Sequence, residues 1–175
     1  MIVFLDFDGV LHPDAVYKPA KKPIELRGDG QLMMHAQMLE DILKPFDASI
    51  VLSTSWVRSL GFSKTLKKMS PALAGRVIGA TWHSNMVDRT VYPYSTGRYA
   101  ADPFNQWSRF DQINYYVIRN NVENWLAIDD LHSGQEIKKW PLDMRRRLVL
   151  TNGFKGLGCV YSQQELIKKL MLHNK

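Results

Sequence analysis

The stretch "VFLDFDGVLH", residues 3–12, places Asp6 and Asp8 at the end of an apolar run and Gly9 directly behind them. The segment "MIVFLDF" is β-branched, aromatic and almost continuously apolar, which predicts a strand buried on both faces. Strands of this kind are typical of parallel sheets that helices cover on each side. The stretch therefore predicts an α/β fold with two like charges at the end of its first strand.

Strand-like and helix-like segments alternate along the rest of the chain. Helical spacing of apolar residues predicts helices over 30–46, 109–121 and 162–173, with Ser162 as a candidate N-cap of the last one. Continuous apolar runs predict further strands over 48–55, 76–81, 124–130 and 146–152, and residues 63–73 are expected to be short helical or turn material. This alternation predicts a parallel sheet of about five strands joined by right-handed crossovers.

Length and composition limit the possible organisation of the chain. With 175 residues, 45% of them hydrophobic, we expect a single domain over residues 1–175. Lysine and arginine number 23 against 17 aspartates and glutamates, and the net charge of +6 favours anionic partners such as phosphorylated metabolites or nucleic acid, although solubility alone also explains it. One cysteine excludes an internal disulfide. Because no run approaches the ~20 residues of a membrane span, we expect a cytoplasmic protein with no membrane partner.

Polar side chains follow three of the predicted strands. Ligands of open α/β sheets bind outside the carboxyl ends of the strands, so these side chains should meet in one cleft. Four carboxylates packed together repel one another and require a cation. A set of oxygen ligands without histidine or thiolate suits Mg²⁺. The side chains are Asp6 and Asp8 after the first strand, Ser53, Thr54 and Ser55 after the second, and Asp129 and Asp130 after the fourth.

The same strand ends resemble the motifs of the haloacid dehalogenase (HAD) superfamily of phosphohydrolases. The first motif, Asp-x-Asp-Gly-(Thr/Val), is matched by "FLDFDGV", the second by "IVLSTS" and the fourth by "WLAIDD". The third motif is a lone basic residue, for which Arg109 is the candidate where many members have lysine. The resemblance covers nearly the whole chain. It implies a Rossmann-like three-layer sandwich with small loop or hairpin insertions in place of a large cap domain.

The resemblance also implies a mechanism, that of a Mg²⁺-dependent phosphomonoester hydrolase with an aspartyl-phosphate intermediate. Asp6 is then the nucleophile that attacks phosphorus. Asp8 is the acid that protonates the leaving oxygen and later the base that deprotonates the attacking water. Magnesium would contact the Asp6 carboxylate, the Asp8 backbone carbonyl and Asp129 or Asp130, and the choice between the last two stays open.

Phosphate binding is implied for Thr54, the Ser55 amide and Arg109. The residues alone do not decide between the hydroxyls of Ser53 and Thr54. An arginine at position 109 is equally compatible with a solvated helix face. His12, just behind the first motif, either lines the cleft or is a loop histidine bonded to backbone, and the second interpretation is favoured.

Substrate choice is the least determined feature. Residues 82–107 mix aromatic and basic side chains without helical period, which is typical of a substrate-facing insertion beside an open cleft. Packing of these aromatics onto the body of the domain is the competing interpretation. A phosphorylated substrate, in the form of a nucleotide or nucleic-acid end, is the leading expectation. A small-metabolite phosphatase, a phosphoprotein phosphatase and a non-catalytic phosphate- or nucleic-acid-binding module are the alternatives.

Overall fold

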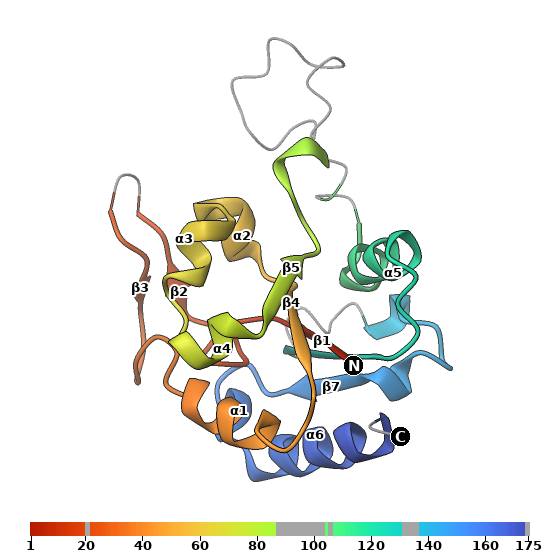
Figure 1. Cartoon of the computed structure of the whole chain (residues 1–175). Coiled ribbons are helices and arrows are strands. Elements are labelled where there is room, and N and C mark those ends of the chain that lie inside the picture. The colour runs from red at the N-terminus through yellow and green to blue at the C-terminus, as the bar shows by residue number, and fades with distance from the viewer. Residues whose placement is uncertain (20–21, 87–103, 105–106, 131–136, 174–175) are drawn as a thin grey trace.

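The computed structural model contains one five-stranded parallel sheet, as the sequence predicts. It describes residues 1–19, 22–86, 104, 107–130 and 137–173. The strand order is β5-β4-β1-β6-β7, with β1 in the centre (Figure 1). The strands are β1 (Ile2–Leu5), β4 (Ser49–Leu52), β5 (Val77–Ala80), β6 (Trp125–Asp130) and β7 (Leu148–Thr151).

Helices cover both faces of this sheet, because the strands bury side chains in both directions. On β1, Val3 and Leu5 join one core cluster and Phe4 joins the other. The first cluster includes side chains of α1 (Ala36–Leu43), α2 (Ser55–Leu60), α4 (Pro71–Gly75) and α6 (Val160–His173). The second is built on α5 (Arg109–Arg119; Figure 1) and on Trp140. The fold is therefore the expected Rossmann-like three-layer sandwich.

Two of the predicted helices begin elsewhere than expected. The helix expected over 30–46 is α1, which starts only at Ala36 because Met33 has a φ of 62°, a left-handed conformation that a helix cannot include. It ends ahead of Pro45, as predicted. The closing helix α6 starts at Val160, so Ser162 is a buried residue inside its first turn, and its assignment as N-cap is wrong.

The remaining helical elements are short. The segment expected as helical or turn material over 63–73 forms α3 (Phe62–Leu66) and the start of α4. Among the described residues, 3₁₀ turns include Ser84–Met86 (η1), Arg145–Arg147 (η4) and Gly156–Gly158 (η5). None of the helices in the described ranges is long and apolar enough to cross a membrane.

A small antiparallel hairpin, β2 (Val16–Tyr17) and β3 (Glu25–Leu26), occupies the connection between β1 and α1. The Lys18 ammonium donates to the Ser59 carbonyl and so ties the hairpin to α2. Most of the insertion predicted at 82–107 lies outside the described residues. At its start, Trp82 is half-buried and packs against the first core cluster, as the packing interpretation expects for that one side chain.

Candidate active site

Strand register brings three of the polar strand ends together. Leu5 pairs with Leu52 on one side and with Ile128 on the other. The residues that follow, Asp6, Ser53 and Asp129, are therefore neighbours at the carboxyl edge of the sheet. Between β1 and β6 the winding of the chain reverses direction, and ligands of open α/β sheets bind at such a point.

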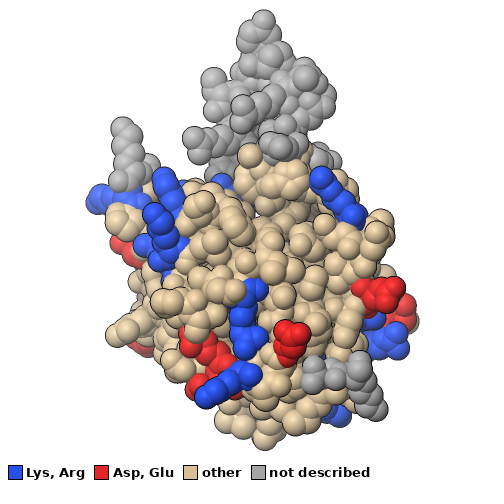
Figure 2. All heavy atoms as spheres, in the orientation of Figure 1, with Lys and Arg blue, Asp and Glu red and all other residues tan. Residues whose placement is uncertain are grey.

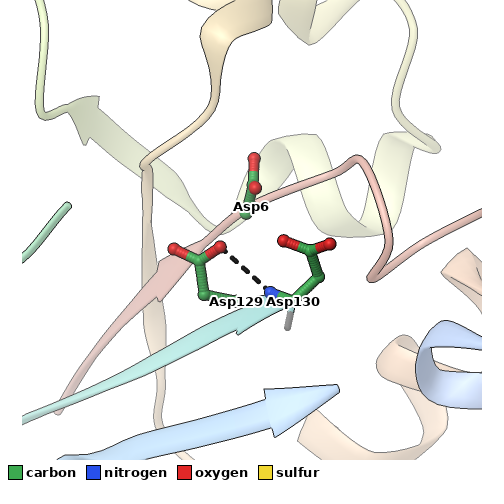
Figure 3. A group of neighbouring side chains, drawn as sticks. All are labelled: Asp6, Asp129 and Asp130. Atoms are coloured by element: carbon green, nitrogen blue, oxygen red, sulfur yellow. Dashed lines mark hydrogen bonds between the residues drawn. The ribbon is translucent and has the colours of Figure 1, made fainter. Parts of the chain in front are cut away.

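Asp6, Asp129 and Asp130 form a compact acidic cluster (Figure 3). One carboxylate oxygen from each lies within 4.8 Å of the others, and the three residues are only 2%, 3% and 1% exposed. Burial raises the pKa of Asp6 well above its usual value, and the charges of Asp129 and Asp8 add to this effect. Burial also raises the pKa of Asp129. Ionised, the cluster is repulsive, so a bound cation would stabilise it.

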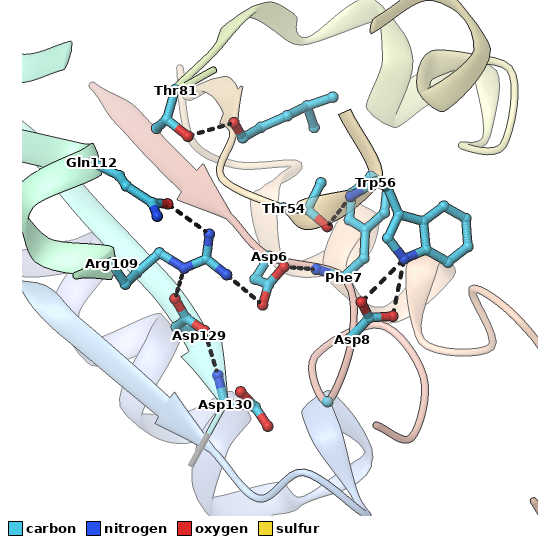
Figure 4. Close-up of polar contacts among 12 residues, drawn as sticks. Asp6, Phe7, Asp8, Thr54, Trp56, Thr81, Arg109, Gln112, Asp129 and Asp130 are labelled. Atoms are coloured by element: carbon cyan, nitrogen blue, oxygen red, sulfur yellow. Dashed lines mark hydrogen bonds and ion pairs between the residues drawn. The ribbon is translucent and has the colours of Figure 1, made fainter. Parts of the chain in front are cut away.

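Arg109 is the positive charge that faces this cluster. Its Nε lies 2.8 Å from Asp129 Oδ2, and its Nη2 lies 3.3 Å from Asp6 Oδ2 (Figure 4). It is the first residue of α5, whose start is fixed by a capping box between Ser108 and Asp111. The side chain is only 14% exposed and pairs with two acids of the cluster, so it does not lie on a solvated helix face.

Asp8 lies beside the acidic cluster but is held by other partners. The indole Nε1–H of Trp56 donates to both carboxylate oxygens, at 3.0 and 3.1 Å (Figure 4). His12 Nε2 lies 3.1 Å from Oδ1. The Asp8 side chain is 22% exposed, so it is much more accessible than the three clustered aspartates. The two carboxyl groups therefore have different surroundings, which can divide two chemical roles between them.

The hydroxyls after β4 have different surroundings. Thr54 is the N-cap of α2, and its Oγ1 accepts from the Trp56 amide at 3.4 Å. Ser53 is 1% exposed, and its Oγ has no hydrogen-bond partner among the described residues. Ser55 is the first residue of α2 and is exposed. A buried hydroxyl without a partner, placed next to Asp6 by strand register, is free to donate to a ligand.

Gly9 allows the chain to turn directly against the acidic cluster. Its φ is +70°, and a Cβ at this position would lie 2.5 Å from Asp130 Cβ and 2.7 Å from Asp130 Oδ2. Thr151 Oγ1 donates to the Gly9 carbonyl at 2.7 Å, which ties the turn to the end of β7. Only glycine fits this position without displacing Asp130.

Gly9→Ala should therefore destabilise the fold by about 2–4 kcal/mol, from left-handed strain together with overpacking. Gly75→Ala is the matched control, because no atom lies within 4 Å of a Cβ there and its φ is ordinary. The control should change stability by less than about 1 kcal/mol. Urea unfolding of both variants measures the difference, and equal midpoints would show that the turn tolerates a side chain.

The sequence also matches a known family, described as the HAD domain in Swiss Army Knife RNA repair proteins, over residues 2–159. The chain belongs to this family. Comparisons with curated proteins and with solved structures gave no significant match. The resemblance seen in the three strand-end motifs is thus confirmed, and the family supports a HAD phosphohydrolase.

In this HAD domain the structure brings together most of the residues expected from the motifs. Asp6, Asp129 and Asp130 form one cluster and Arg109 pairs with the first two, whereas the Asp8 carboxylate faces Trp56. Sequence reasoning missed Trp56. The available signal was the position of Trp56 directly after the second motif, in "LSTSW". Its indole N–H is a donor that an aspartate of the first motif can accept from.

Proposed function

We propose that this HAD domain is a Mg²⁺-dependent phosphomonoester hydrolase that acts on nucleic-acid ends through an aspartyl-phosphate intermediate. The observation that carries the proposal is the position of Asp6, a buried carboxylate between the Arg109 guanidinium and two further aspartates. A purely structural site gains little from three buried acids around one arginine, because their burial is costly. A site that must hold a cation and a phosphoryl group needs this combination.

The acidic cluster fits magnesium on its donor chemistry. Its ligands are all oxygens, they come from three carboxylates, and burial raises the pKa values of Asp6 and Asp129, which makes the ionised cluster costly without a cation. Asp6 and one or both of Asp129 and Asp130 would hold the ion, with the Asp8 carbonyl as a further ligand. When bound, Mg²⁺ supplies the charge neutralisation that lets an anionic nucleophile approach an anionic phosphoryl group.

The steps of the reaction are then carried out by three side chains of this protein. A carboxylate oxygen of Asp6 forms a bond to phosphorus while the bond from phosphorus to the leaving oxygen breaks. Asp8 gives its proton to that oxygen, which leaves as an alcohol. In the second half, Asp8 takes a proton from water, the hydroxyl oxygen attacks phosphorus, and Asp6 is released with inorganic phosphate. Arg109 stabilises the charge on the transferring group throughout.

Of the two candidate hydroxyls, the surroundings favour Ser53 as the phosphoryl ligand. The Thr54 oxygen already accepts a helix N–H, whereas the Ser53 oxygen is buried next to the nucleophile without a described partner. Thr54 would then contribute by fixing the start of α2, which positions the Ser55 amide toward an anion. Ser53→Ala should raise KM for phosphorylated substrates more than Thr54→Ser does, since serine retains the cap.

A nucleic-acid end is the substrate class that best fits the surface. Lysine and arginine side chains gather over α3 and the adjoining hairpin (Figure 2). The hairpin comes soon after the first motif in the chain, and α3 comes soon after the second. A nucleic-acid strand whose phosphorylated end reaches Asp6 would therefore pass near both elements. Positive charge of this kind binds phosphodiester backbones without regard to sequence. The family description, which concerns RNA repair, points the same way. The exposed lysines of the hairpin, of α3 and of the residues just after α3 are Lys18, Lys22, Lys64, Lys67 and Lys68.

The test is phosphate release from oligonucleotides with a 3′- or a 5′-phosphate, measured beside nucleotides, sugar phosphates, a phosphopeptide and nitrophenyl phosphate. We expect the highest kcat/KM on one class of oligonucleotide end. Higher kcat/KM on a sugar phosphate or phosphopeptide would leave the hydrolase in place and reject the nucleic-acid assignment. Phosphate release from none of them would reject the hydrolase itself.

Replacing Lys64, Lys67 and Lys68 of α3 and its flank by glutamine should weaken oligonucleotide hydrolysis selectively. Each lost phosphate contact should reduce the slope of log(kcat/KM) against log[salt] by about 0.7 on a single strand. Hydrolysis of nitrophenyl phosphate, which has no backbone, should not change. Lys138→Gln with Lys139→Gln serves as a control charge removal on another element. An unchanged salt slope in the triple variant would show that α3 does not contact the strand.

A further inference from the structure

We propose that Trp56 and His12 are a positioning pair that holds the Asp8 carboxylate in one orientation for proton transfer. The inference rests on the proposed function, since it concerns the residue assigned there as acid and base. The two side chains come from different places, His12 from the turn after β1 and Trp56 from the first turn of α2. Neither belongs to the acidic cluster around Asp6.

Trp56 supplies the first half of the pair. Its Nε1–H lies 3.0 Å from Asp8 Oδ1 and 3.1 Å from Oδ2, so one donor is shared between the two oxygens. The indole is 2% exposed and meets the Phe7 ring edge to face, with centroids 5.5 Å apart. Its backbone N–H donates to the Thr54 hydroxyl. Both ends of the residue are therefore fixed, and the N–H cannot follow Asp8 to another rotamer.

His12 supplies the second half, and its tautomer follows from its other contact. Nδ1 accepts from the Met33 amide at 3.3 Å, so a neutral ring carries its proton on Nε2. That proton is directed at Asp8 Oδ1, 3.1 Å away. The ring is fully buried and lies 5.5 Å from the Trp56 ring, centroid to centroid. The left-handed Met33, which shortens α1, thereby presents the amide that orients His12.

The two donors occupy the Asp8 oxygens unequally. Oδ1 receives both the imidazole and the indole, whereas Oδ2 receives only the shared indole contact. A carboxyl oxygen that already accepts two donors has no lone pair left for a further proton. The geometry thus assigns Oδ2 as the oxygen that carries the proton to the leaving group. Loss of either donor would let the Asp8 carboxylate rotate, so that the proton would no longer stay on an oxygen directed at the leaving group.

Proton donation matters in proportion to the basicity of the leaving group. Nitrophenolate is a weak base and leaves without being protonated. The alkoxide of a nucleoside is a strong base, so it needs a proton in order to leave. A defect in the position of Asp8 should therefore appear in kcat/KM for an oligonucleotide phosphate and be nearly absent for nitrophenyl phosphate. A general loss of stability would lower both by the same factor.

Trp56→Phe removes the N–H and keeps an aromatic ring. We expect kcat/KM to fall about tenfold to a hundredfold on the preferred oligonucleotide phosphate and less than about threefold on nitrophenyl phosphate. Trp125→Phe is the matched control, because Trp125 is equally buried but lies at the first residue of β6, away from the catalytic edge. This control variant should change kcat/KM for the two substrates by the same factor.

The histidine is tested by two replacements that separate its nitrogens. Asparagine places an amide group near the position of Nδ1 and can still accept from Met33, but it offers nothing to Asp8. Glutamine reaches the position of Nε2 and restores a donor there. His12→Asn should show the same substrate-dependent loss as Trp56→Phe, and His12→Gln should recover part of it.

A spectroscopic measurement tests the contact without turnover. Trp56→Phe identifies the Trp56 indole N–H resonance among those of the five tryptophans. Asp8→Ala should shift this resonance and leave those of Trp125 and Trp140 in place. No shift, or equal losses on both substrates in Trp56→Phe, would overturn the positioning pair while wild-type hydrolysis stands. Wild-type protein that hydrolyses neither substrate would overturn the proposed function and the role of the pair together.

Discussion

Asp6→Asn is expected to lower phosphate release by more than about a thousandfold, because an amide keeps the shape of the side chain but cannot attack phosphorus. The variant should stay folded, since it exchanges one planar group for another of the same size at a position that is 2% exposed. Steady-state release of phosphate from the preferred oligonucleotide measures the loss. Turnover within tenfold of wild type would contradict the assignment of Asp6 as nucleophile.

The same variant should alter the dependence of stability on pH in the metal-free protein. Burial raises the pKa of Asp6 in the folded state, with Arg109 opposing and the charges of Asp129 and Asp8 adding to it. A group of this kind binds its proton more tightly when folded, so its contribution to stability is fully present below the usual aspartate pKa of about 3.9. That contribution is lost as the pH rises through the raised folded value. Asparagine does not titrate and avoids this loss.

In chelator, the melting temperature of wild type should thus fall more between mildly acidic and neutral pH than that of Asp6→Asn. Asp47→Asn is the control for removal of a negative charge alone, because Asp47 is exposed and precedes β4, whereas the site lies at the other end of that strand. Its melting curve should follow that of wild type across the range. A wild-type stability that rises with pH in chelator would contradict the raised pKa.

The sheet and the strand-end acids were predictable from sequence because they depend on local patterns. Continuous apolar runs identified all five parallel strands, and register in a parallel sheet then requires Asp6 and Asp129 to be neighbours. The resemblance implied small loop or hairpin insertions, but the position of the β2–β3 hairpin was not predicted, because strands of two residues carry no period. Helix α1 was overestimated because apolar spacing continues through Met33, whose left-handed backbone no periodicity indicates.

The parts of the site that sequence could not supply are those made by tertiary contacts. Nothing local distinguishes Arg109 from a solvated helix arginine; its burial against Asp6 and Asp129 follows from the placement of α5 over the sheet edge. Trp56 meets Asp8 across a separation of 48 residues. Likewise Arg147 donates to the Trp125 carbonyl, and its guanidinium lies over the Trp125 ring. Each of these contacts joins residues that are brought together only when the sheet has folded.

Removal of metal should abolish hydrolysis and also weaken the fold at neutral pH. Chelator leaves three buried carboxylates faced by the Arg109 guanidinium, and the raised pKa values of Asp6 and Asp129 mean that the charged cluster is unfavourable there. Magnesium should restore activity and, at a hundredfold excess over its Kd, add about 2.7 kcal/mol of stability. Calcium should stabilise the fold but antagonise turnover, because its looser coordination misplaces Asp6.

Separate Asp129→Asn and Asp130→Asn variants should identify the direct ligand, since the two acids have different surroundings. Asp129 accepts from the Asp130 amide and pairs with Arg109, so its loss frees the guanidinium as well as a metal ligand. Asp130 is packed against Gly9 and Gly153, which fixes its carboxylate by shape. The variant with the larger rise in the Mg²⁺ concentration for half-maximal activity, and in the concentration for half-maximal thermal stabilisation, is the direct ligand. If full activity persists in chelator, or neither variant changes the Mg²⁺ requirement, the acidic cluster is not a metal site.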